Sequence, residues 1–140
     1  MSEKYKILGK FIKDMSSETP DAETYIFVRD YISKYQLNID INSKAVKNKM
    51  IEINTILKFE DMQENKKKSY FEINYATIVK IDDQIKEKAE LEKIILCDVQ
   101  IDIYPELEKA FLDLLHNSGY PEVKFEKKIN FEELYNQRLN

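Results

Sequence analysis

Residues 69–81 alternate so regularly that they predict one long β-strand with two unlike faces. Alternate positions are apolar or aromatic, and the positions between them are largely polar, which is the period of two expected of a half-buried strand. A slip of one residue would exchange the two faces. One row can therefore pack in the core or bind an apolar ligand, and the other row can contact a charged partner. The apolar row contains Phe71, Ile73, Tyr75, Val79 and Ile81, and the other row contains Tyr70, Glu72, Asn74 and Lys80.

Three further segments predict strands that pair with this one. Residues 35–42 and 50–60 repeat the alternation, and residues 5–15 show it more weakly, with Gly9 as a candidate bulge. The polar residues 61–68 fit a hairpin loop between the third strand and residues 69–81. These signals predict a four-stranded antiparallel sheet arranged as a meander.

Helical spacing of apolar residues follows the last strand. One helix is predicted after Ile81, and a second from about residue 100 or 105 to 117, with Pro105 in its first turn and Gly119 as its cap. Asn130 followed by Glu133 resembles a capping box that opens a short last helix. The fold class is therefore predicted to be α+β, with a four-stranded antiparallel sheet, two main helices and a short C-terminal helix, in one domain over residues 1–140.

Composition argues against several classes of function. The net charge is −4, from 22 basic and 26 acidic residues, which disfavours nucleic-acid binding. Two glycines are too few for a glycine-rich phosphate loop, and no metal site or cofactor is expected with one cysteine and one histidine. No apolar run approaches the roughly 20 residues that span a membrane, and the N-terminus lacks an apolar export segment. We therefore expect a cytoplasmic protein without direct membrane insertion.

The candidate catalytic side chains are weak. Cys97 follows an apolar run, where a cysteine is usually part of the core, and His116 lies where a cation stabilises the end of a helix. The lysine run at residues 66–68 fits a solvated hairpin tip. We expect no catalytic residues and no enzyme activity, although the numerous carboxylates leave general acid-base chemistry open.

Several short motifs resemble the SecB family of export chaperones, over almost the whole chain. Residues 11–22, FIKDMSSETPDA, are similar to the family's aromatic-x-Lys-Asp-hydrophobic-Ser-x-Glu-x-Pro-Asn-Ala segment. Asp30-Tyr31 resembles its Asp-Trp pair, and residues 37–40 resemble its Leu-Asp-Leu-Asp. Residues 69–81 resemble its third long strand, and residues 119–121 and 130–135 resemble two segments near its end. The sequence departs from the family at Ala76-Thr77, where the family has Gly-Gly.

This resemblance implies an ATP-independent holdase that binds unfolded precursor proteins and delivers them to the SecA motor. It also implies a homotetramer, built as a dimer of dimers, with no bound cofactor. The residues that match the family's SecA-docking face are Asp14, Glu18, Tyr70 and Glu72. The residues that match positions near the peptide groove or the tetramer interface are Tyr31, Phe71, Ile73 and Tyr75, and the sequence does not separate these two roles.

Three alternatives remain open at this point. The first is a SecB-like chaperone dedicated to an antitoxin, although the retained acidic positions favour export. The second is a small-molecule enzyme of hot-dog-like architecture, in which the long helix would precede most strands instead of following them. The third is a purely structural oligomer, which would have no affinity for unfolded chains.

Overall fold

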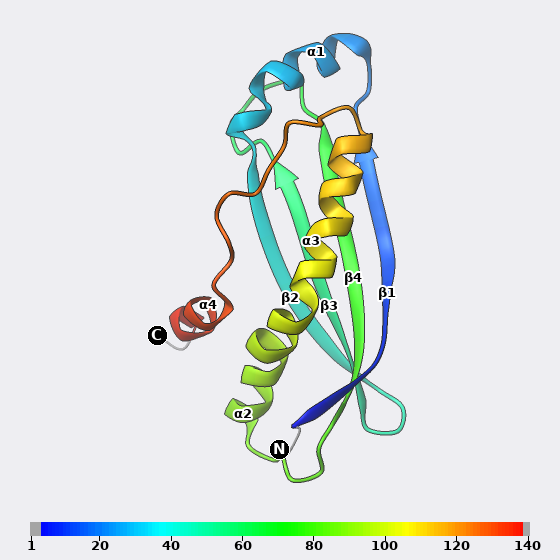
Figure 1. The fold of residues 1–140 in the computed structure, drawn as a ribbon, viewed down its shortest axis with the longest axis vertical. Coiled ribbons are helices and arrows are strands. Elements are labelled where there is room, and N and C mark those ends of the chain that lie inside the picture. The colour runs from blue at the N-terminus through cyan, green and yellow to red at the C-terminus, as the bar shows by residue number, and fades with distance from the viewer. Residues whose placement is uncertain (1–3, 139–140) are drawn as a thin grey trace.

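A four-stranded antiparallel sheet forms the body of this computed structural model, which describes residues 4–138 (Figure 1). The sheet order is β1-β4-β3-β2, so β1 and β2 are the edge strands. Residues 70–81 form the inner strand β4, and the alternation seen in the sequence matches its burial. The strands are β1 (Tyr5–Glu18), β2 (Gln36–Val46), β3 (Met50–Glu60) and β4 (Tyr70–Ile81).

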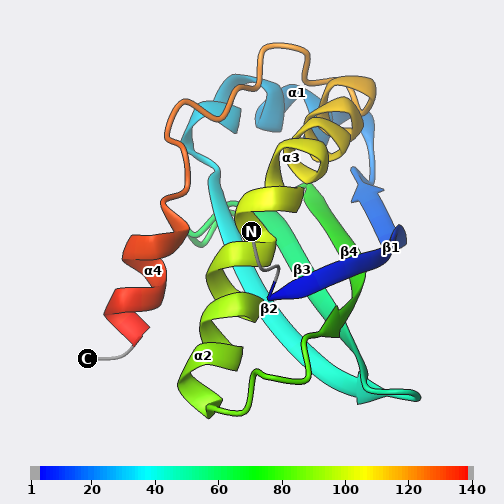
Figure 2. The ribbon, with the colours of Figure 1, turned by 60° about the horizontal axis from the view of Figure 1, so that its bottom comes forward.

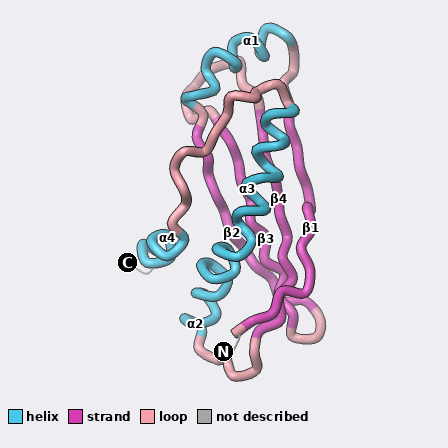
Figure 3. Tube along the Cα trace, viewed as in Figure 1, coloured by secondary structure: helices cyan, strands magenta, loops and turns pink. Residues whose placement is uncertain are grey.

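The predicted meander holds for three strands and is wrong for β1. Strands β2, β3 and β4 are joined by hairpins, but β1 pairs with β4, from Tyr5 opposite Ile81 to Glu18 opposite Tyr70. The chain then crosses the end of the sheet through α1 (Ala22–Tyr31) and the 3-10 turn η1 (Ile32–Lys34) to reach β2 on the far edge (Figure 3). The expected bulge at Gly9 is confirmed by a register shift between Ile7 and Gly9.

A local cap explains why α1 forms in a stretch without a clear apolar period. The side chain of Asp21 accepts a hydrogen bond from the backbone N–H of Thr24 at 2.8 Å, which satisfies one free donor at the helix start. Thr24 and Val28, one turn apart, are the buried residues of the helix. The cap bond also lowers the pKa of Asp21.

The two main helices that were predicted after the sheet form one continuous run, which crosses a face of the sheet. It comprises α2 (Lys88–Lys93), the π-helical turn η2 (Ile94–Asp98) and α3 (Val99–Asn117) (Figure 2). Pro105 therefore lies inside α3 and not in a first turn. A π-turn adds one residue and shifts the phase of the apolar stripe. This change of phase explains why the apolar spacing in the sequence divides into two helices.

The core lies between α3 and the covered face of the sheet. Leu107, Phe111 and Leu115 are fully buried against apolar residues such as Ile53 and Ile73. The short α4 (Phe131–Arg138) lies beside β2, and no helix among residues 4–138 lies over the opposite face (Figures 1 and 2). We call this uncovered side the open face. The sheet with its flanking helices confirms the predicted α+β fold class.

Candidate functional site

The two rows of β4 face different surroundings. Phe71, Ile73 and Tyr75, which were predicted to lie near a groove or an interface, are 2%, 0% and 8% exposed under α3. Burial raises the pKa of the Tyr75 hydroxyl, and this hydroxyl donates to Glu106 of α3 at 3.2 Å. The three side chains therefore form the core of this chain. The fourth predicted member, Tyr31, lies on α1, where it is half-buried and stacks on Phe27 with ring centroids 5.5 Å apart.

The structure brings together the four residues predicted for docking a charged partner. Glu18 pairs with Tyr70, and two residues along, Ser16 pairs with Glu72. Asp14 pairs with Asn74 in the same register, and side chains directly opposite each other share a face of the sheet. Tyr70 is 59% exposed and projects from the open face. We call Asp14, Glu18, Tyr70 and Glu72 the acidic end of the open face.

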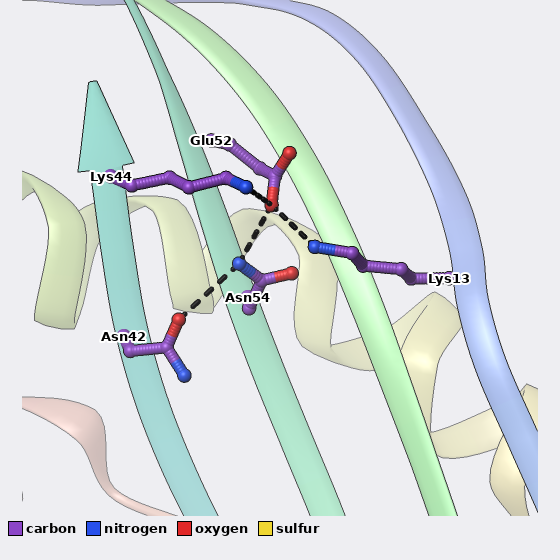
Figure 4. Close-up of polar contacts among 5 residues, drawn as sticks. All are labelled: Lys13, Asn42, Lys44, Glu52 and Asn54. Carbon is purple, nitrogen blue, oxygen red and sulfur yellow. Dashed lines mark hydrogen bonds and ion pairs between the residues drawn. The ribbon is translucent and has the colours of Figure 1, made fainter. Parts of the chain in front are cut away.

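Farther along the open face, a polar cluster surrounds the buried carboxylate of Glu52 with two lysines and two asparagines (Figure 4). Glu52 accepts from Lys13 at 2.8 Å and from Asn54 at 2.9 Å, and Lys44 lies 3.8 Å away. Hydrogen bonds, first from Lys13 and then from Asn54, lower the pKa of Glu52. Asn54 also donates to Asn42 of β2 at 3.3 Å. We call these five residues the Glu52 cluster.

The Glu52 cluster joins strands that are not neighbours. Figure 4 shows Lys13 of β1 reaching across β4 toward Glu52 of β3. Ala76, which is next to Asn54 in the register, is fully buried, and its small side chain leaves room for this crossing. A register shift between Ile12 and Asp14 marks the place of Lys13 on β1. The cluster therefore separates the acidic end from the rest of the open face with two lysines.

A groove that was not predicted from the sequence lies at the edge of the sheet. A cavity of about 330 Å³ lies between the edge of β2 and helix α4, and its apolar wall includes a side chain from η2. We call it the α4 groove. Asp40 is its only charged lining residue among those described. The cavity is lined by Ile39, Asp40, Ile41, Leu96, Phe131, Leu134, Tyr135 and Gln137.

Contacts at both ends of α4 hold it at the groove. Asn130 caps the helix by accepting from Glu133 N–H at 3.0 Å, as the capping-box motif predicted. Phe131 packs edge-on to Tyr104 of α3 with ring centroids 5.3 Å apart, and the Tyr135 hydroxyl donates to the Ala89 carbonyl at 3.1 Å. Two features of the sequence indicate the elements that form the groove: the alternating apolar residues of β2 and the cap of α4.

The outer edge of β1 is long and partly apolar. It spans 14 residues, and four of its large apolar side chains are between 44% and 46% exposed. An edge strand of this length exposes a row of backbone donors and acceptors to another chain. The four side chains are Leu8, Phe11, Ile12 and Met15.

The two side chains considered for catalysis, Cys97 and His116, are held by contacts within the fold. Cys97 is fully buried, as expected of a core cysteine, and burial raises the pKa of its thiol. His116 Nε2 lies 2.9 Å from the carbonyl oxygen of Val123. Within residues 4–138, no group of three or more His, Cys, Asp or Glu side chains is placed to hold a metal ion. No helix in this range is both long and apolar enough to cross a membrane.

Comparisons with known proteins agree with the motifs. The family model described as Preprotein translocase subunit SecB matches residues 1–140. A protein of Pelagibacter ubique (strain HTCC1062), named for SecB protein export, is 68% identical over 140 residues, which are 100% of both chains. The protein-export protein SecB of Parvibaculum lavamentivorans is 24% identical over 133 residues, covering 95% of this chain and 77% of the relative.

A solved structure shows the same fold. The SecB-like chaperone of Mycobacterium tuberculosis, solved in complex with a ChAD peptide from an antitoxin, superposes with a TM-score of 0.62. The two chains are 12% identical, and the match covers 91% of this chain and 92% of the other. At this identity the likeness concerns the fold alone, so surface chemistry must be argued from the residues of this chain.

Proposed function

Because this chain belongs to the SecB family, whose named members are protein-export chaperones, we propose that it is an ATP-independent holdase that delivers unfolded precursor proteins to SecA. The observation that carries this proposal is the separation of two surfaces by the sheet. The α4 groove is apolar and lies at the β2 edge, whereas the acidic end lies on the open face beside β1. One molecule can then hold a client and meet a basic partner at the same time.

The α4 groove suits unfolded clients because its wall is mainly apolar and does not require a particular client sequence. Burial of apolar side chains is non-directional, so many sequences gain from the same wall. The groove also runs along the edge strand β2, where an extended client is able to form backbone hydrogen bonds. Leu134 is 40% exposed and gives a client an accessible contact.

The acidic end suits a basic surface of SecA. Among the described residues, no cation lies within ion-pairing distance of Asp14 or Glu18, whereas Glu72 already pairs with Lys58 at 3.4 Å. Complementary charge speeds and orients encounter with a basic partner. Tyr70 adds an exposed aromatic ring among these carboxylates, which favours a compact docking spot.

We propose that the β1 edge is covered by a second copy of the chain, as the first step toward a homotetramer built as a dimer of dimers. Its exposed apolar side chains and unpaired backbone would be removed from water in this way. A tetramer lets one extended client touch several grooves, which strengthens weak contacts. Tyr31 is the residue we assign to the client or a neighbouring subunit, because Phe71, Ile73 and Tyr75 are buried in the core of this chain.

The deciding experiment is the light-scattering mass of the pure protein, alone, with a permanently unfolded precursor, and then with SecA added. A tetramer that takes up the precursor and then joins SecA supports the proposal of a holdase that delivers clients to SecA. In this proposal the chain acts in the cytoplasm as a single domain and without catalysis. Client uptake without SecA binding would argue against a role in export and favour a chaperone dedicated to another client, such as an antitoxin. A species that ignores unfolded protein would remove chaperone function.

A further inference from the structure

A buried glutamine links the helical run to the sheet behind the α4 groove. Gln100 is fully buried at the start of α3, just after η2. Its Nε2 donates to the carbonyl oxygen of Ile95 in η2 at 3.2 Å, and its Oε1 accepts from the Thr55 hydroxyl of β3 at 2.9 Å. The amide therefore has one partner in the helical run and one in the sheet.

The two partners of Gln100 lie next to groove residues. Ile95 precedes Leu96, which lines the groove from η2. Thr55 is directly opposite Ile41, which lines the groove from β2. A π-turn interrupts the regular helical bonding, and Gln100 supplies a donor to a carbonyl within that interruption. The glutamine thus fixes the irregular turn to β3, the strand that pairs directly with the opposite wall on β2.

We propose that Gln100 is a positioning residue that sets the spacing between Leu96 and the β2 wall of the α4 groove, and hence the affinity for unfolded clients. It acts through Thr55 and Ile95 and touches no client itself. This inference rests on the proposed client-binding function of the groove. Both polar atoms of the amide are satisfied, so loss of either partner leaves a buried group without a hydrogen bond and favours a shift of η2.

The test uses the full-length protein and substitutions at both ends of the link. Thr55→Val removes the hydroxyl, Thr55→Ser keeps it, and Gln100→Met removes both bonds at similar volume. Thr77→Val is the matched control, because Thr77 is also fully buried in the sheet but its hydroxyl has no hydrogen-bond partner among the described residues. Affinity is measured with a reduced and alkylated, permanently unfolded protein, at a temperature where circular dichroism shows every variant folded.

We expect Thr55→Val and Gln100→Met to bind this client about three- to tenfold more weakly, the range that corresponds to one buried hydrogen bond. Thr55→Ser should bind it like the natural protein, as should Thr77→Val. The double variant Thr55→Val, Gln100→Met should be no weaker than Gln100→Met alone, because both act through one link. Equal affinities in all folded variants would overturn the proposal.

A second readout separates this inference from the proposed function. Hydrogen exchange of the backbone amides in η2 and α4 reports the groove wall without any client. Faster exchange there in Thr55→Val, but not in Thr55→Ser, is expected from the link, and unchanged exchange would count against it. If the natural protein bound no unfolded chain, the proposed function would fail, and the positioning role would be judged on exchange alone.

Discussion

Lys58 and Glu72 face each other across β3 and β4 on the open face, with Nζ 3.4 Å from Oε1. Glu72 belongs to the acidic end, so a basic side chain of a partner must compete with Lys58 for the same carboxylate. The pair is partly exposed, and ion pairs of this kind contribute only about 0.2–1 kcal/mol. The internal pair therefore weakens docking at Glu72 without blocking it.

Removing the competitor should tighten docking. We expect Lys58→Met to lower the dissociation constant for SecA, measured by titration calorimetry, about two- to fivefold. This factor is the energy of the Lys58–Glu72 pair expressed as affinity.

Glu72→Lys should weaken SecA docking and spare client binding, because the groove lies at the opposite edge of the sheet. Both affinities are measurable by titration calorimetry. Equal loss of client and SecA binding in Glu72→Lys would argue against two separate surfaces.

A charge in the α4 groove should have the reverse effect. Leu134→Glu places a carboxylate on the apolar wall, and its desolvation by a bound client is costly. We expect client affinity to fall tenfold or more while SecA docking stays within a factor of two. Met62→Glu is the matched control, since Met62 is an apolar residue 60% exposed outside the groove. If the two variants bound clients alike, the groove would not be the client site.

The features that depend on a local period of apolar residues could be predicted from the sequence. The features that depend on contacts between distant segments could not. The faces of β4 followed from alternation alone, and register then placed Glu18 beside Tyr70 as the motifs implied. Strand pairing of β1 with β4 carries no local signal, because it depends on where α1 delivers the chain. The α4 groove was missed for the same reason: Ile41, Leu96 and Leu134 are far apart in sequence and meet only through tertiary packing.

The β1 edge gives a prediction about assembly. Ile12 is 46% exposed on this edge, opposite Tyr75 in the register. If a second copy covers the edge, Ile12→Glu places like charges from two copies near a buried contact, which destabilises it. Light scattering should show a fall from the tetramer mass to a smaller species. Ile26→Glu on α1, a residue that is 52% exposed and lies outside β1, should keep the full mass. An unchanged mass for Ile12→Glu would place the interface elsewhere.

The Glu52 cluster should make the open face sensitive to acid. The pKa of Glu52 lies below its ordinary value of 4.5 in the folded protein, mainly through the hydrogen bond from Lys13. A lowered folded-state pKa adds stability that is present above 4.5 and is lost as the pH falls through the folded pKa. Glu52→Gln should therefore unfold more easily than the natural protein at pH 7. We expect a difference of about 1 kcal/mol, because both lysines are partly exposed to solvent.

The difference between the two proteins should change with pH in one direction only. Urea unfolding at pH 7, 6 and 5 should give a constant gap in the free energy of unfolding, and the gap should close below pH 4.5 as Glu52 takes up a proton and releases Lys13 and Lys44. Lys13→Met tests the cause, since it removes the largest contribution to the lowered pKa. In this variant the acid-sensitive step should shift toward higher pH. A gap that persists unchanged to pH 3 would show that Glu52 stabilises the sheet by packing and not by its charge.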